Sequence, residues 1–310
     1  MAHAKPQRIR SIGEFHRLRG LPKPEHPLIS IVTTDDFIGQ PDQIAMNFVF
    51  DFYFIALKRG EGVKYKYGQL HYDFEDDGVL FFMSPNQVLE LEIAEEEKNE
   101  KHSGWMLLIH PDFIWNTSLA KNIKQYAFFD YSVNEALLLS EKEENTLNGI
   151  IENIRQEYHS NIDKFSKQII CSHVESLLGY SERFYNRQFI TREKANHQIL
   201  ERLENLLTEY FNSDDLAIKG LPSVQYVSKE LNLSPSYLGS LLRTVTGQST
   251  QQHIHDKLIE KARGKLSNTN LSVSEIAYEL GFEHSQSFSK FFKTKTKMSP
   301  LEFRKQINLR

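Results

Sequence analysis

The chain has 310 residues, of which 40% are hydrophobic and 25% are charged, fractions typical of a globular protein with room for two domains. Cys171 is its only cysteine, which excludes an internal disulfide framework and favours a reducing compartment, the cytoplasm. The longest apolar stretch, Met46 to Leu57, is interrupted by Asn47 and Asp51 and is too short to span a bilayer, so we expect no membrane contact.

Charge is distributed unevenly along the chain, whose formal net charge is -4. The segment from Ala217 to Arg310 contains 14 Lys+Arg and 7 Asp+Glu, a net charge of +7. The remainder contains 23 Lys+Arg and 34 Asp+Glu, a net charge of -11. A basic segment of this kind attracts a phosphate backbone, although an ordinary solvated basic surface has the same composition.

From about Leu28 to Trp115, runs of β-branched and aromatic residues alternate with turn residues. This pattern predicts short strands joined by frequent turns, and hence an antiparallel sandwich or barrel. The runs that show the pattern best are Ile44–Phe54, Val63–Tyr67, Gln69–Phe74 and Val79–Met83.

The first of these runs has the alternation of a strand. Phe50, Phe52 and Phe54 should share one face, with Asp51 and Tyr53 on the other. Aromatic residues at this spacing indicate a packed core, but a small apolar or aromatic effector could also bind inside such a barrel. Both interpretations stay open from the sequence.

The hydrophobic period changes at about Ser140, which forms a capping-box pattern with Glu143. Apolar residues then recur at helical spacing on both sides of a break at Ser160-Asn161, which predicts an αα-hairpin over about residues 140–188. Its apolar face either packs on the strands of its own domain or also forms a dimer interface. A further amphipathic helix is expected from Ala195 to Phe211.

The C-terminal part of the chain contains the same unit twice. Its apolar positions coincide at an offset of 49 before the turn and 50 after it. The matching residues are Val224, Val227 and Leu231 with Val273, Ile276 and Leu280, then Leu238, Leu241 and Leu242 with Phe288, Phe291 and Phe292. Each copy predicts a short helix, a tight turn and a second helix, which is a helix-turn-helix unit whose second helix fits the major groove of DNA.

One helix, from Thr250 to Leu266, is expected to link the two units. At 1.5 Å per residue its length is about 25 Å, so it could hold two recognition helices about one DNA turn apart. His253 and His255 point in different directions on this helix, which argues against a metal site. Serines that can cap the helices of the repeat are Ser223, Ser234, Ser249, Ser272 and Ser299.

The recognition helices should bury their Leu and Phe side chains and present the others to DNA. In the first helix we expect the DNA-binding residues Ser236, Tyr237, Gly239, Ser240 and Arg243. In the second helix we expect Ser285, Gln286, Ser287, Lys290 and Lys293. Because Gln can pair with adenine and Lys with guanine, the second helix should specify sequence while the first mainly positions the protein.

The spacing of Ile276-Ala277, Gly281-Phe282, Phe292-Lys293 and Ser299-Pro300 is a specific signature. On these residues the chain resembles the AraC/XylS-type transcription regulators. The resemblance implies a DNA-binding domain over residues 191–310, with helix-turn-helix units at about 223–249 and 272–300. It also implies a cupin-like β-sandwich with the helical hairpin over residues 1–190, serving effector binding or dimerisation.

Two departures from the family pattern concern the repeat. Leu242-Arg243 replaces the usual Phe-Lys of the first copy, and Lys297 replaces a common glycine of the second. The resemblance implies base contacts by Ser236, Gly239 and Ser240 in the first helix, and by Ser285, Gln286, Ser287 and Lys290 in the second.

The sequence therefore predicts an α+β protein of two domains that binds double-stranded DNA at promoters and controls transcription, as an activator, through contact with RNA polymerase. Its N-terminal domain should respond to a small-molecule effector, or else serve only homodimerisation or protein docking. A cupin-type enzyme fused to a DNA reader is a further alternative, but His71, His102 and His110 are too widely spaced for a catalytic metal site. We expect no enzymatic activity, cofactor or metal.

Overall fold

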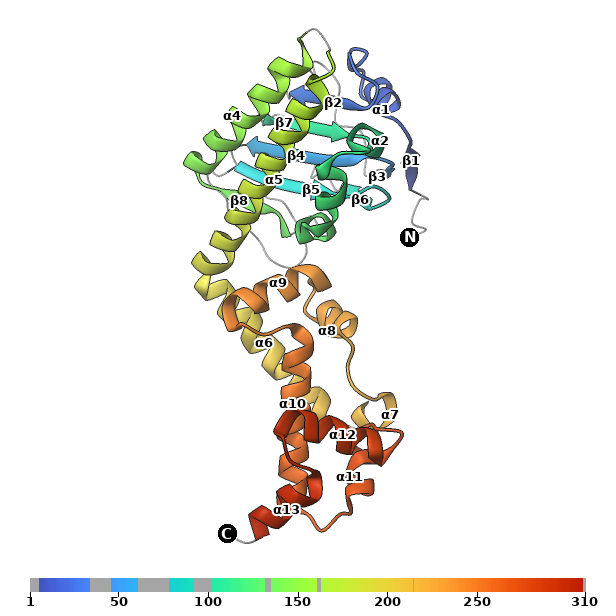
Figure 1. Cartoon of the computed structure of the whole chain (residues 1–310), viewed down its shortest axis with the longest axis vertical. Coiled ribbons are helices and arrows are strands. Elements are labelled where there is room, and N and C mark those ends of the chain that lie inside the picture. Colours follow the sequence, from blue (N-terminus) through green and yellow to red (C-terminus); the bar gives the residue numbers. More distant parts are fainter. Residues whose placement is uncertain are drawn as a thin grey trace. The chain divides into compact units, whose positions relative to one another are not determined.

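The computed structural model describes residues 6–33, 46–60, 78–91, 102–131, 135–160, 163–213 and 215–308 (Figure 1). The chain divides into two compact units, Met1–Gln188 and Phe189–Arg310. The first unit combines strands with helices and the second is helical over its described residues, which confirms the predicted α+β class. Across the described ranges, no helix is both long enough and apolar enough to cross a bilayer.

The strands of the first unit form two sheets. They are β1 (Gln7–Ile9), β2 (Ile29–Thr33), β3 (Met46–Phe50), β4 (Tyr53–Gly60), β5 (Gly78–Met83), β6 (Val88–Leu91), β7 (His102–Ile109) and β8 (Leu137–Leu139). One sheet has the order β1-β3-β6 and the other β2-β7-β4-β5-β8. The described pairings are antiparallel, as predicted, except that β1 runs parallel to β3. The predicted strands at 63–67 and 69–74 lie outside the described residues.

Aromatic rings pack together where the two sheets face each other. The ring centroid of Phe50 lies 5.2 Å from that of Phe52 and 5.5 Å from that of Phe54, and all three rings belong to one buried cluster. Tyr53 packs instead against Phe129, at a centroid distance of 5.3 Å. The predicted alternation is thus confirmed, although the predicted single run is divided between β3 and β4.

A helical hairpin packs on the five-stranded sheet of this unit. The helices of the unit are α1 (Ile12–Leu18), α2 (Pro111–Ile114), α3 (Ser118–Asn122), η3 (Ile123–Gln125), η4 (Ala127–Asp130), α4 (Glu141–Tyr158) and α5 (Ser166–Thr191). The residues of α5 from Phe189 on belong to the second unit. Figure 1 shows α4 and α5 lying across that sheet. Trp105 of β7 donates its indole N–H to Asn148 of α4 at 2.8 Å, and Phe82 of β5 contacts the ring of Tyr185 of α5. The predicted hairpin is confirmed, and its apolar face covers its own sheet.

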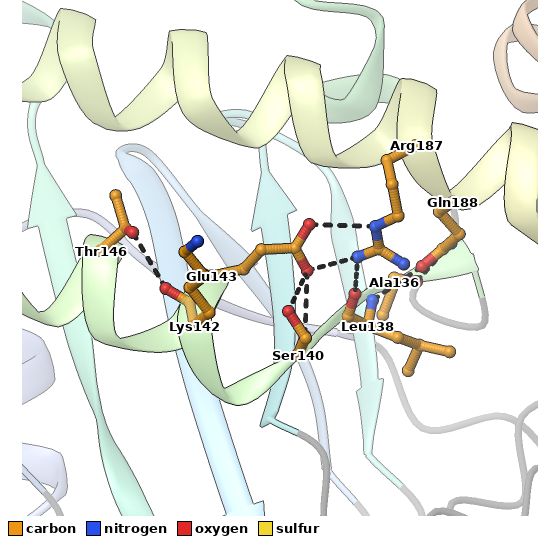
Figure 2. A network of polar contacts seen from close by, with 8 residues as sticks. All are labelled: Ala136, Leu138, Ser140, Lys142, Glu143, Thr146, Arg187 and Gln188. Atoms are coloured by element: carbon orange, nitrogen blue, oxygen red, sulfur yellow. Dashed lines mark hydrogen bonds and ion pairs between the residues drawn. The ribbon is translucent and has the colours of Figure 1, made fainter.

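The end of α5 is fixed to the outer edge of this sheet by side chains (Figure 2). Gln188 accepts a hydrogen bond from the backbone N–H of Leu138 at 2.8 Å and donates one to the carbonyl of Ala136 at 3.3 Å. Arg187 donates to both carboxylate oxygens of Glu143, at 3.0 and 2.6 Å, and to the carbonyl of Leu138 at 2.6 Å. These side chains satisfy backbone groups that an edge strand would otherwise leave unpaired.

The second unit consists of helices joined by short turns. They are α6 (Glu193–Asn212), α7 (Asp215–Lys219), α8 (Val224–Glu230), α9 (Pro235–Thr246), α10 (Thr250–Asn268), α11 (Val273–Glu279), α12 (Ser285–Thr296) and α13 (Pro300–Asn308). Helix α10 contacts α6, α9, α11 and α13 and therefore forms the spine of this unit. It extends two residues beyond its predicted end at Leu266.

Candidate nucleic-acid interface

The second unit contains two helix-turn-helix pairs, α8 with α9 and α11 with α12. Each turn includes one residue in the left-handed region, Asn232 with φ 58° in the first pair and Gly281 with φ 78° in the second. These positions are related by the offset of 49 found in the sequence. Asn and Gly are the residues that tolerate this conformation best, so the repeat extends to the backbone of the turn.

Hydrogen bonds of serine residues at the first turns of the helices explain why the helix boundaries could be predicted from the sequence. Ser234 accepts a hydrogen bond from the N–H of Tyr237 at 3.2 Å, one turn into α9. Ser272 and Ser299 donate their backbone N–H groups to the carboxylates of Glu275 and Glu302, both at 2.7 Å. These backbone N–H bonds are the largest cause that lowers the pKa of each carboxyl group below its usual range. The predicted caps at these serines are confirmed.

The buried sides of the recognition helices hold each helix pair together. Leu238, Leu241 and Leu242 of α9 and Phe288 and Phe292 of α12 are fully buried, as expected. Each such side chain contributes about 1.5–3 kcal/mol through burial.

Phe291 departs from this pattern, because it is only partly buried. Its ring lies 5.0 Å from that of His255 on α10 and 5.9 Å from that of Phe282. The expectation that all three phenylalanines of α12 are buried was therefore wrong for this residue.

Helix α12 exposes polar and basic side chains on its outer side. Gln286, Ser287, Lys290 and Lys293 are exposed, and Ser285 is partly exposed. The helix contains no acidic residue. This surface can offer an amide, hydroxyls and ammonium groups to the edges of bases and to phosphates.

Helix α9 exposes fewer groups that could bind DNA than α12 does. Arg243 is exposed, and Ser236 and Ser240 are partly exposed. Tyr237 and Gly239 were expected to face outward, but both are buried.

The two errors have simple physical causes. Tyr237 lies four residues before Leu241 and so falls on the buried stripe of α9, where its ring packs edge-on against Phe189 at 5.2 Å and leaves 6% of the residue exposed. Gly239 has no side chain to project, and a Cβ added there would lie 3.6 Å from the guanidinium of Arg243. The side chain of Tyr237 is therefore not available to bind DNA, and Gly239 can allow only a close approach of the backbone to DNA.

Comparisons with known proteins bear on this unit. Residues 227–306 match the family described as "Helix-turn-helix domain". The chain is similar to the Msm operon regulatory protein of Streptococcus mutans, with 39% identity over 84 residues that make up 27% of this chain and 30% of that protein. It is also similar to the arabinose operon regulatory protein of Escherichia coli, with 32% identity over 114 residues, 36% of this chain and 39% of that protein.

The C-terminal unit is an AraC-type helix-turn-helix domain. The chain spans less than half the length of either curated relative. Among solved structures, the C-terminal domain of the two-component response regulator yesN from Fusobacterium nucleatum is similar at 28% identity, over 34% of this chain and 95% of that one, with a TM-score of 0.30.

The linking helix of the AraC-type domain connects its two recognition helices. Helix α10 has 19 residues, and at 1.5 Å per residue its length is about 28 Å. Its buried apolar residues fall at helical spacing on the side that faces the other helices, and they are Ile254, Leu258, Ile259, Ala262 and Leu266.

The two histidines of α10 each contact a different recognition helix. The Nε2 atom of His253 lies 3.0 Å from the hydroxyl of Thr246 at the end of α9. The ring of His255 packs against Phe291 of α12. Burial is the largest cause that lowers the pKa of each histidine below its ordinary value, and it favours the neutral form of both. Within the described part of the chain, no group of three or more His, Cys, Asp or Glu residues could hold a metal ion.

Some of the positive charge of the domain is used within the domain itself. Lys261 donates to Asn212 at 2.6 Å, Lys265 pairs with Glu279, and Lys257 lies 3.0 Å from Glu260. These lysines of α10 border a groove between α6 and α10 rather than the exposed side of α12. The net charge of the segment therefore overstates the charge available to DNA on the recognition helices.

Proposed function

We propose that this protein is a sequence-specific DNA-binding transcription regulator of the AraC type that acts in the cytoplasm and has no enzymatic activity. One observation carries the proposal: helix α12 exposes Gln286, Ser287, Lys290 and Lys293 without an acidic residue on the helix. This helix is the second member of a helix-turn-helix pair, which is the element that enters the major groove of DNA.

The exposed groups divide into two roles. Gln286 and Lys290 lie nearer the start of α12, where recognition helices contact base edges, so Gln286 reads adenine and Lys290 reads guanine, with Ser285 and Ser287 beside them. Lys293 lies further along α12 and binds phosphate. Helix α9 supplies one phosphate anchor, Arg243, and the short side chains of Ser236 and Ser240, so it positions the domain more than it specifies sequence.

The experiment that tests this function is selection of bound fragments from genomic DNA by the purified full chain. Enrichment of one sequence motif supports the proposal, and mapping of that motif upstream of genes supports promoter control through RNA polymerase. Enrichment that does not depend on sequence would contradict it.

For the N-terminal unit we propose control of DNA binding, either by a small effector or by self-association. Self-association is favoured by Phe165, the residue just before α5, and by Ile169 and Tyr180 of α5, which are 53%, 40% and 39% exposed. Their separations of four and eleven residues place them on one side of the helix. A second copy of the chain would remove these side chains from water.

The two roles have different tests. If α5 forms a dimer interface, Ile169→Glu should convert a dimer to a monomer in analytical ultracentrifugation, while Glu182→Lys on the same helix should not. If a small effector controls the unit, a specific compound should raise the melting temperature in a thermal-shift screen. A monomeric unsubstituted chain would contradict self-association.

A further inference from the structure

The end of helix α12 has an unusual backbone for the residue it contains. Lys297 is the C-cap, with φ 66° and ψ 4°, and its N–H donates to the carbonyl of Lys293 at 2.8 Å. This left-handed conformation is strained for a side chain of the L configuration and is normally occupied by glycine.

The first recognition helix shows the same cap without the strain. Gly247 ends α9 with φ 73° and ψ 3°, and its N–H donates to Arg243 at 3.0 Å. Gly247 and Lys297 are related by the offset of 50 that relates the two recognition helices. The chain therefore holds a glycine at this cap in one copy and accepts a strained lysine in the other.

Local contacts of Lys297 offset only part of this strain, which costs about 1–2 kcal/mol. Its ammonium group donates to the carbonyl of Thr294 at 3.3 Å, and at an exposed site a positive charge near the end of a helix contributes about 0.3–1 kcal/mol. A strained residue that is only partly compensated locally points to a function of its side chain.

The position of Lys297 suggests what that function is. Gln286, Lys290, Lys293 and Lys297 are separated by four, three and four residues, and all are exposed. This spacing places the first three in one row along α12, and Lys297 follows that row at the C-cap. The corresponding row in the first copy is Ser236, Ser240, Arg243 and Gly247, so the second row carries three positive charges where the first carries one.

We propose that Lys297 is a DNA phosphate anchor at the C-terminal end of the second recognition helix. This inference rests on the proposed function and extends it to a residue outside the predicted set. When the start of such a helix reads bases, its far end approaches the sugar-phosphate backbone. A strained lysine thus occupies the cap in place of glycine because its ammonium group lies at the end of the row of side chains that contacts DNA.

The test measures the dissociation constant of the full chain for its selected DNA fragment as a function of salt concentration. Lys297→Gly should lower the slope of log K against log salt by about 0.9, the value for one phosphate. The loss of affinity should therefore be about 3.5-fold greater at 50 mM than at 200 mM salt. Circular dichroism should show a higher melting temperature for Lys297→Gly, because the cap is no longer strained.

Lys295→Ala is the matched control. Lys295 is exposed and belongs to the same helix end, but it lies off the row. This variant should leave the salt slope of the unsubstituted chain unchanged. Equal slopes for Lys297→Gly and the unsubstituted chain, or equal losses in the two variants, would overturn the assignment. Failure of the unsubstituted chain to bind any fragment would overturn the proposed function, and the anchor with it.

Discussion

Replacement of Gly281 by alanine should destabilise the second unit through two separable effects. Gly281 has φ 78°, a left-handed conformation that costs a non-glycine residue about 1–2 kcal/mol. An added Cβ would also lie 2.4 Å from the carbonyl oxygen of Leu216 and 2.9 Å from the Cα of Gly220, both backbone atoms that cannot rotate away. Overpacking of this kind costs about 1–3 kcal/mol, so the expected total is about 2–5 kcal/mol.

The matched control is Asn232→Ala at the same position of the first turn. Asn232 also has a positive φ, of 58°, but it already carries a Cβ, so this variant should lose only the tolerance of asparagine for that conformation. Urea unfolding followed by circular dichroism reports the helices, which make up the second unit and include α4 and α5 of the first. Fluorescence of Trp105 and Trp115, the two tryptophans of the chain, reports the first. Gly281→Ala should move the circular-dichroism transition of the second unit to lower urea concentration. It should leave the tryptophan fluorescence transition of the first unit unchanged. A cost no larger than that of Asn232→Ala would refute the clash with the backbone of Leu216 and Gly220 at α7.

Further predictions concern the reading surface, the sheet edge and pH. Lys290→Ala should lose about 1–3 kcal/mol of discrimination at one base in a competition assay, whereas Lys293→Ala should weaken binding to all fragments alike; identical behaviour of the two variants would show that the assigned roles are wrong. Gln188→Ala should leave two backbone groups of the β8 edge unpaired at a cost of about 1–3 kcal/mol, visible as an earlier tryptophan transition in urea. Burial lowers the pKa of His253 and His255, so the unfolded chain binds more protons than the folded one at pH values between the lowered pKa and the ordinary value of about 6.5. The stability of the second unit should accordingly be fully present above about pH 6.5 and fall as the pH drops below it. Substituting both histidines by glutamine should flatten this dependence in thermal melts, and an unchanged pH slope would show that other groups cause it.

Local features of the sequence predicted much of this fold because the interactions that cause them are local. Ser272 and Glu275 are three residues apart, and their capping box forms within one turn of helix. The offset of 50 residues between Leu241 and Phe291 could be read from the repeated sequence alone, and it predicted the second recognition helix from the first. The alternation of Phe50, Phe52 and Phe54 with Tyr53 likewise was visible from the period-2 pattern, although a bend at residues 51–52 divides the run.

Features that depend on distant residues were not predictable in this way. The spacing of Tyr237 from Leu241 indicated its buried side, but its ring contact is with Phe189, which lies on a different helix. The parallel pairing of β1 with β3 joins segments separated by more than 30 residues, and a sequence pattern does not encode direction. The φ of Lys297 was also hidden, although its alignment with Gly247 was a usable signal, because glycine at a helix end indicates a left-handed cap.

The central claim is that α9 and α12, joined by α10, place two recognition helices of one chain in neighbouring major grooves. Methylation interference on the selected fragment tests it most directly, because methylated guanine N7 atoms block contacts in the major groove. The account predicts two clusters of interfering guanines about 10 base pairs apart on one side of the duplex, and loss of effects at one cluster with Lys290→Ala. A single cluster, or interference confined to the minor groove, would contradict it.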